Sequence, residues 1–127
     1  METNMTQLAS DRSQRTEPLA LLLVETHSPA EATGGEFISL ARTLLNSGAV
    51  VQLHFMQNGV TWLQESPQVL RNLAGGFGGR LRLTVDDVSL DLRGIPHASA
   101  IGVAEVRAVE TLVSDMAQRR VKTLWHS

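Results

Sequence analysis

RLRLTVDDVSLDLRGIPH, Arg80 to His97, is the stretch on which the interpretation of the whole chain depends. Apolar and polar residues alternate from Leu81 to Val85, which predicts a strand. The acidic pair Asp86-Asp87 follows directly, and a short apolar segment then leads to Arg93-Gly94. Open α/β sheets usually place ligands or chemistry where the carboxyl end of a strand opens into a helix. Asp86 is therefore the first position at which we expect a functional site.

The composition is that of an ordinary globular domain. The chain has 127 residues, of which 43% are hydrophobic and 19% charged, and its formal net charge is −2. This length allows one domain with its own core, and the charge gives no electrostatic footprint for nucleic acid. The longest apolar run, Leu19 to Val24, is far shorter than the ~20 residues that span a bilayer. Because it also lacks the flanks of a signal peptide, we expect a cytoplasmic protein.

The chain contains no cysteine. Disulfides, thiolate nucleophiles, persulfide carriage and cysteine metal sites are therefore all excluded.

Apolar patterning predicts alternating strands and helices behind a polar leader. Residues 1–17 lack apolar periodicity and predict a flexible N-terminal tail, or alternatively an arm that docks on a neighbouring subunit. Residues 18–127 are expected to form a single domain. Its expected strands are Pro18–Thr26, Ala49–Met56, Leu81–Val85 and Val121–His126, with a further short strand left open around Ile95–Ala100. Its expected helices begin at Glu36, Pro67, Asp87 and Ser99, the last running to Arg120. This order predicts a three-layer α/β/α sandwich with a mostly parallel, about five-stranded sheet.

Local signals mark several of these boundaries. Thr33-Gly34-Gly35-Glu36 matches a capping box at the start of a helix, and Gly48 suits the left-handed position at its end. Ser66-Pro67 predicts the N-cap and first residue of the next helix. Ala74 to Gly79, AGGFGG, predicts a flexible connector around Phe77. The Gly34-Gly35 pair lacks the lysine and other glycines of a phosphate-binding loop.

Four segments together resemble a known family. They are the helix ending LARTLLNSG (Leu40–Gly48), the strand and turn VVQLHFMQNGV (Val50–Val60), the segment LRLTVDDVSLDLRGI (Leu81–Ile95), and the final helix with its closing strand. In this order they resemble the DsrE/DsrF-like sulfur-relay family, which includes the TusB, TusC and TusD subunits and the YchN-like proteins. The resemblance implies a YchN-type fold and trimers or hexamers of related subunits. It also implies a cysteine after the third strand that carries sulfur as a persulfide.

The chain departs from that pattern at the cysteine. Asp86 stands at the matching position, and a carboxylate can neither form a persulfide nor attract an anionic sulfur group. Arg93-Gly94, also part of the motif, is intact. The resemblance therefore predicts a subunit that has kept the scaffold and lost the thiol.

The candidate residues allow both structural and functional interpretations. Asp86 and Asp87 point to opposite faces if both lie on a strand, so capping of a helix is the favoured role, with metal or general-base roles as alternatives. The four histidines match no zinc-motif spacing, although His27 and His97 follow predicted strand ends and can line one pocket. Arg93 either binds an anion or anchors its loop, for example through carbonyls or Asp91. Trp62 and Trp125 are interface anchors or core residues, at equal weight. The candidate pocket comprises Asp86, Asp87, Arg93, His27, His97 and Asn58.

The first functional hypothesis is a non-catalytic DsrE-like subunit that acts as an assembly or accessory component related to sulfur relay or sulfur oxidation. Its expected partners are further copies of itself, as a trimer or hexamer, and cysteine-bearing sulfur-transfer proteins. The alternative is a small-molecule-binding protein or non-thiol enzyme with a pocket around Asp86. Neither hypothesis assigns a cofactor or a metal.

Overall fold

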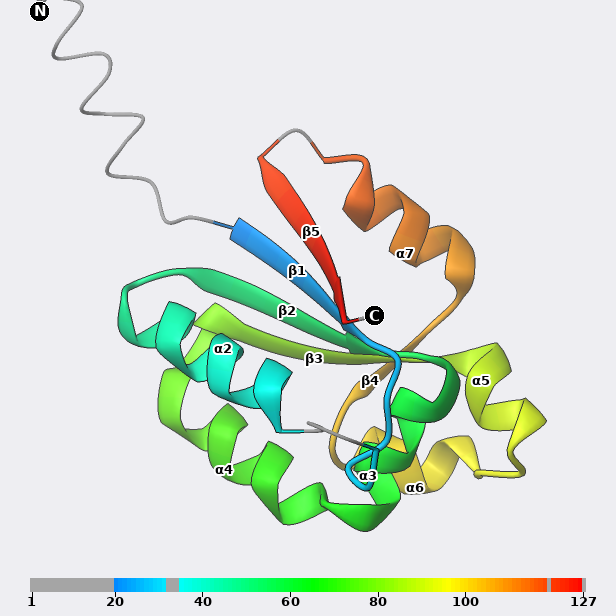
Figure 1. The fold of residues 1–127 in the computed structure, drawn as a ribbon. Coiled ribbons are helices and arrows are strands. Elements are labelled where there is room, and N and C mark those ends of the chain that lie inside the picture. The colour runs from blue at the N-terminus through cyan, green and yellow to red at the C-terminus, as the bar shows by residue number, and fades with distance from the viewer. Residues whose placement is uncertain (1–19, 32–34, 119, 127) are drawn as a thin grey trace, which may run out of the picture.

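The chain folds into a five-stranded sheet with helices on both faces (Figure 1). This computed structural model describes residues 20–31, 35–118 and 120–126. The strands, in the spatial order β4-β3-β2-β1-β5, are β1 (Ala20–Glu25), β2 (Val50–Phe55), β3 (Leu81–Asp86), β4 (Glu105–Arg107) and β5 (Val121–His126). Every pair of neighbouring strands is parallel. The predicted α/β sandwich with a mostly parallel sheet is thereby confirmed.

The helices divide unequally between the two faces of the sheet. Figure 1 shows α2 (Glu36–Asn46) and α4 (Pro67–Phe77) on one face and α7 (Val109–Met116) on the other. The shorter segments are η1 (Gln57–Thr61), α3 (Trp62–Glu65), η2 (Gly78–Arg80), α5 (Asp87–Leu92) and α6 (His97–Ile101). In the part of the chain that the structure describes, no helix combines the length and apolarity needed to cross a membrane.

The two faces of the sheet differ in character because side chains alternate along each strand. Leu21 and Leu23 of β1 belong to the large core under α2 and α4. Leu22 and Val24, which point the other way, form a small cluster with Leu112 of α7. On this same face, β2 carries Gln52 beside Leu22 and His54 beside Val24. The next strand, β3, carries Thr84 beside His54. The α7 face is therefore the polar side of the sheet.

The predicted long helix from Ser99 to Arg120 is wrong. The segment instead forms α6, the short strand β4 and α7, and the short strand considered at 95–100 lies at β4 instead. The valines of this segment fit a helical repeat, but they are also β-branched residues that favour strands. Pairing of β4 with β3 decides the outcome: Val106 aligns with Val85, and the Arg82 guanidinium bonds the Glu105 carboxylate at 3.1 and 3.3 Å.

The predicted connector at residues 74–79 is also wrong in its first half, because α4 continues to Phe77. Leu70 and Leu73 are fully buried, and Phe77 continues their spacing and packs against the same core. That packing offsets the helix penalty of Gly75 and Gly76, about 1 kcal/mol each relative to alanine. The helix ends at Gly78, whose φ of 59° is left-handed.

The other helix boundaries follow the sequence signals in part. Gly48 has the predicted left-handed backbone, with φ of 100°. Ser66 is the N-cap of α4 and Pro67 its first residue, although the Ser66 side chain makes no capping hydrogen bond. The predicted tail at residues 1–17 and the capping-box residues Thr33 and Gly34 lie outside the described residues.

Candidate functional site at the carboxyl ends of the strands

Asp86, the last residue of β3, is the N-cap of α5. Its Oδ2 atom accepts hydrogen bonds from the backbone N–H of Ser89 at 2.8 Å and from the Ser89 hydroxyl at 2.6 Å. The residue is 5% exposed. Such a cap satisfies one of the free N–H groups of the first helical turn, and the charge complements the helix dipole. The predicted capping role of Asp86 is confirmed.

Ser89 connects this cap to the turn after β2. Its hydroxyl accepts a hydrogen bond from the backbone N–H of Gln57 at 2.8 Å. Gln57 has a left-handed backbone with φ of 54°, which is uncommon for a residue other than glycine. The bond from its N–H to Ser89 therefore fixes a strained turn at the carboxyl end of β2.

Arg93 closes the same loop from the other end of α5. Its guanidinium donates to the carbonyl oxygen of Ser89 at 3.2 Å and to the side-chain oxygen of Asn58 at 2.8 Å. This is the loop-anchoring arrangement considered from the sequence, with the carbonyl and Asn58 as acceptors. Asp91, the carboxylate considered there, instead pairs with His97 at 2.8 Å.

A buried polar network lies beneath Asp86 on the α7 face of the sheet. The Thr84 hydroxyl contacts the His54 ring at Nδ1, 2.7 Å, and accepts from the Gln52 amide at 3.1 Å. The same amide donates to Asp115 of α7, which also accepts from Arg107 at 2.7 Å. Burial lowers the pKa of His54 to about 4, and the nearby Asp86 carboxylate opposes that shift. His54 is therefore a neutral core histidine at pH 7.

A second polar cluster lies on the opposite face, where β1 and β5 end. Glu25 and His126 are neighbours across the two strands, and Glu25 Oε2 lies 2.6 Å from His126 Nδ1. Glu25 Oε2 also accepts from the backbone N–H of His27 at 3.1 Å. The His27 and His126 rings lie 4.6 Å apart, and Phe37 of α2 stacks on His126 at 4.8 Å. The His126 ring thus contacts the buried Glu25 carboxylate and the rings of His27 and Phe37.

The six residues of the predicted pocket do not share one set of contacts. Asp86, Arg93 and Asn58 meet around Ser89, as described above. Asp87 accepts from the N–H of Val88 at 2.7 Å, His97 lies with Asp91, and His27 belongs to the Glu25 cluster. The pKa of Glu31 is lowered mainly by a backbone hydrogen bond from Ser28. The charge of His27 and a hydrogen bond from Asn58 lower it further, so the loop that carries His27 still lies near Asn58.

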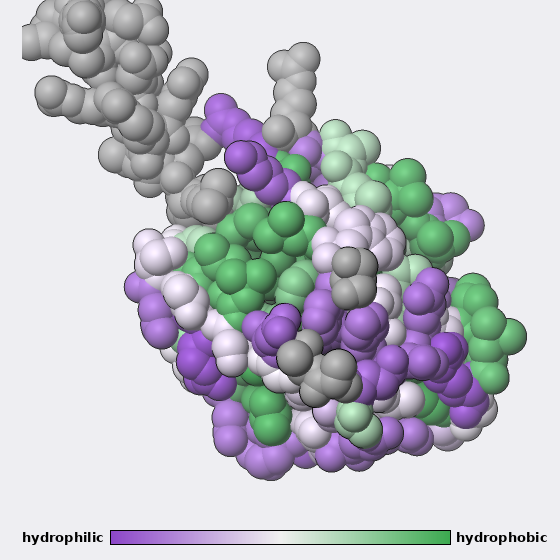
Figure 2. Space-filling model, viewed as in Figure 1, coloured by the Kyte–Doolittle hydropathy of each residue, from purple (hydrophilic) through white to green (hydrophobic). Residues whose placement is uncertain are grey.

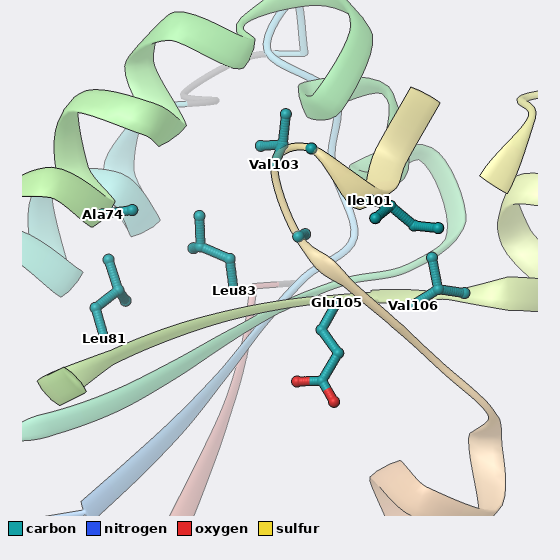
Figure 3. Close-up of a pocket in the computed structure, with 9 residues that line it drawn as sticks. Ala74, Leu81, Leu83, Ile101, Val103, Glu105 and Val106 are labelled. Carbon is teal, nitrogen blue, oxygen red and sulfur yellow. The ribbon is translucent and has the colours of Figure 1, made fainter. Parts of the chain in front are cut away.

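One apolar cavity lies away from all of these residues. It has a volume of about 520 Å³ and opens between the end of α4, β3 and the segment from α6 to β4. Figure 3 shows Leu81, Leu83, Val103 and Ala74 around it, whereas the Glu105 carboxylate points to the other side of β4. Its lining offers apolar contact and no charged group directed inward, so it carries no chemistry of its own.

Sequence reasoning missed Ser89, Gln57, Glu25 and His126 as parts of these clusters. Ser89 had a usable signal, since a residue three places after an N-cap aspartate is the one whose N–H the cap accepts. The two tryptophans separate: Trp62 is buried in the core and its indole N–H donates to the His27 carbonyl at 2.8 Å, whereas Trp125 is 47% exposed.

Comparison with solved structures identifies the fold. The protein of unknown function MTH1491 from Methanobacterium thermoautotrophicum superposes with a TM-score of 0.69 at 13% identity, over 84% of this chain and 99% of that one. The YchN protein from E. coli gives 0.64 at 18% identity, over 83% and 98%. The protein of unknown function BT1422 from Bacteroides thetaiotaomicron gives 0.64 at 12% identity, over 84% and 94%. No family model and no curated protein matches the sequence.

These comparisons establish a YchN-like α/β fold for a chain without cysteine. At these identities the likeness concerns the fold alone.

Proposed function

We propose that this chain is a non-catalytic DsrE-like subunit, an assembly or accessory component related to sulfur relay. It binds further copies of itself and cysteine-bearing sulfur-transfer subunits, and it carries no persulfide. The observation that supports this proposal most directly is the state of Asp86, which matches the position of the sulfur-carrying cysteine in the family that the sequence resembles.

Asp86 is occupied by a structural task. Its carboxylate is buried and accepts two hydrogen bonds from Ser89. A persulfide carrier must instead present its sulfur to a partner. Asp86 is therefore part of the scaffold, and its charge stabilises the start of α5 instead of attracting an anionic substrate.

The free edge of β5 supports a role in assembly. Among the described residues β5 pairs on one side only, with β1. Leu124 lies on the same face as its register partner Leu23, but α2 packs over β1 and β2, so Leu124 is 44% exposed. Trp125, on the opposite face, is 47% exposed. Figure 2 also shows an apolar surface over β1, between β5 and α2. An edge strand with apolar side chains on both faces is suited to a subunit interface.

The decisive experiment combines a mass measurement with a pull-down. The molar mass of the full chain in solution is measured by light scattering, and partners captured from the native host are identified by mass spectrometry. We expect a trimer or hexamer, and stoichiometric recovery of DsrE-like subunits that possess the cysteine. The double variant Leu124→Asp/Trp125→Asp should be monomeric and capture none of them.

The matched control is Val69→Asp on α4, since Val69 is 40% exposed and lies away from β5. It should keep both the mass and the partners of the unmodified chain. A monomeric unmodified protein that captures no thiol-bearing subunit would refute the proposal. Equal losses in the control variant would remove β5 as the interface.

A further inference from the structure

We infer that Glu25, His27 and His126 bind one divalent transition-metal ion, with Zn²⁺ as the best match to the donors. These residues come from the ends of β1 and β5 and the loop after β1. One potential ligand atom from each lies within 4.8 Å of the other two. The site is separate from Asp86, which lies on another strand and on the opposite face of the sheet.

One oxygen of the Glu25 carboxylate is buried without a partner and is free to bind a cation. Glu25 is 0% exposed, and its Oε2 atom is used by His126 and by the N–H of His27. Its Oε1 atom is buried and has no hydrogen-bond partner among the described residues. Buried carboxylate oxygens are nearly always paired, because their desolvation is costly. A metal ion beside Oε1 removes this deficit.

The donor set is chemically suitable. Two imidazoles and one carboxylate are ligands that Zn²⁺ uses in catalytic sites, where three protein ligands leave a position open. The same set suits other first-row divalent ions. Glu36, at the start of α2, lies 3.9 Å from His126 Nε2 and is largely exposed, so it is available as a fourth ligand or as a hydrogen-bond acceptor.

The surroundings restrict how the ligands can move. Phe37 stacks on the His126 ring with an interplanar angle of 20°, which fixes its orientation. The His27 carbonyl accepts the Trp62 indole N–H, which anchors the backbone of the His27 loop. Such supporting contacts orient ligands in metal sites. An ion pair between Glu25 and His126 explains the contact that Oε2 makes. It explains neither why Oε1 is buried without a partner nor why His27 lies beside both residues.

The test is a titration of the full chain, without a histidine tag and after treatment with a chelator. CoCl₂ is added and the visible absorption of bound Co²⁺ is recorded, and ZnCl₂ is then added as competitor. We expect about one Co²⁺ per chain, with the low-symmetry spectrum of mixed nitrogen and oxygen ligands, displaced by Zn²⁺. Glu25→Gln and His27→Ala should each weaken binding by roughly 100-fold or more, since even supporting residues cost 10–100-fold.

His97→Ala is the matched control, because it also removes one partly exposed histidine that lies beside a carboxylate. It should leave the affinity unchanged. His27→Ala decides the matter if Glu25→Gln does not fold, because no hydrogen bond of the described residues uses the His27 ring and its two backbone bonds are retained. Absence of saturable Co²⁺ binding would overturn the inference, and so would binding that survives His27→Ala or is lost in His97→Ala.

Discussion

Replacement of Asp86 by alanine tests whether this residue is a structural cap. The substitution removes the acceptor of the Ser89 N–H and of the Ser89 hydroxyl, both within 2.8 Å. It creates no steric conflict, since alanine is smaller than aspartate. Any loss of stability therefore reports on the lost hydrogen bonds and on the lost charge at the start of α5.

The expected loss is about 2–4 kcal/mol in the free energy of unfolding. Loss of an N-cap contributes about 1 kcal/mol. Ser89 is 5% exposed, and a buried hydroxyl without its acceptor adds about 1–3 kcal/mol. Asp86→Ser should recover about half of the loss, because serine is also a favoured N-cap but is too short to make both bonds in the same geometry.

The measurement is urea unfolding at pH 7, followed by tryptophan fluorescence at one fixed protein concentration so that self-association contributes equally to every variant. Asp87→Ala is the control. Among the described residues, Asp87 bonds only the adjacent Val88 N–H, so its replacement should cost less than about 1 kcal/mol. If Asp86→Ala cost under about 0.5 kcal/mol, or no more than Asp87→Ala, the capping role would be wrong and Asp86 would be free for chemistry.

Four further substitutions follow from the same structure. Gly59→Ala should destabilise the fold by several kcal/mol, measured in the same unfolding assay, because an added Cβ would lie 2.0 Å from the Glu25 carbonyl oxygen; near-normal stability would contradict that close approach. Gly75→Ala and Gly76→Ala should each raise the free energy of unfolding by about 0.5–1 kcal/mol, and with it the melting temperature, because both positions are helical and an added Cβ meets no neighbouring atom. The pKa of His54 is about 4 in the folded chain and 6.5 in the unfolded chain. Between these two pH values His54 is protonated in the unfolded chain but neutral in the folded one. Up to about 3 kcal/mol of the free energy of unfolding is therefore lost as the pH falls from 6.5 to 4. His54→Gln should flatten the pH dependence there, and an unchanged slope would assign it to other groups.

The strands on which the sheet depends could be predicted because their signals are local. β1, β2, β3 and β5 appear in the sequence as apolar segments of strand length, bounded by turn residues. The region from Gly102 to Met116 could not be predicted in the same way. Its valines satisfy both a helical repeat and a strand, and the choice is made by β3, which pairs with β4 along its open edge.

The same distinction explains the candidate site. Asp86 was interpretable as a cap because the cap and its helix are adjacent in the sequence. Glu25 and His126 are 101 residues apart and meet only because β5 returns beside β1. The sequence predicted that His27 can line a pocket together with His97, but His97 pairs with Asp91 instead. Contacts that depend on strand order leave no trace in local spacing.

The Asp86 cap and the Glu25–His126 cluster lie on different strands and on opposite faces of the sheet. Asp86 ends β3 and points to the face covered by α7, whereas Glu25 ends β1 and points to the face covered by α2, with β2 between the two strands. The capping role of Asp86 on one face therefore places no constraint on the ligands of the other. An accessory subunit needs only its fold and its free β5 edge, and metal binding needs only the end of β1 beside the end of β5. Because His126 belongs to β5, an assembled partner on that edge would lie beside the metal ligands, and this common element is where assembly and metal binding can influence each other.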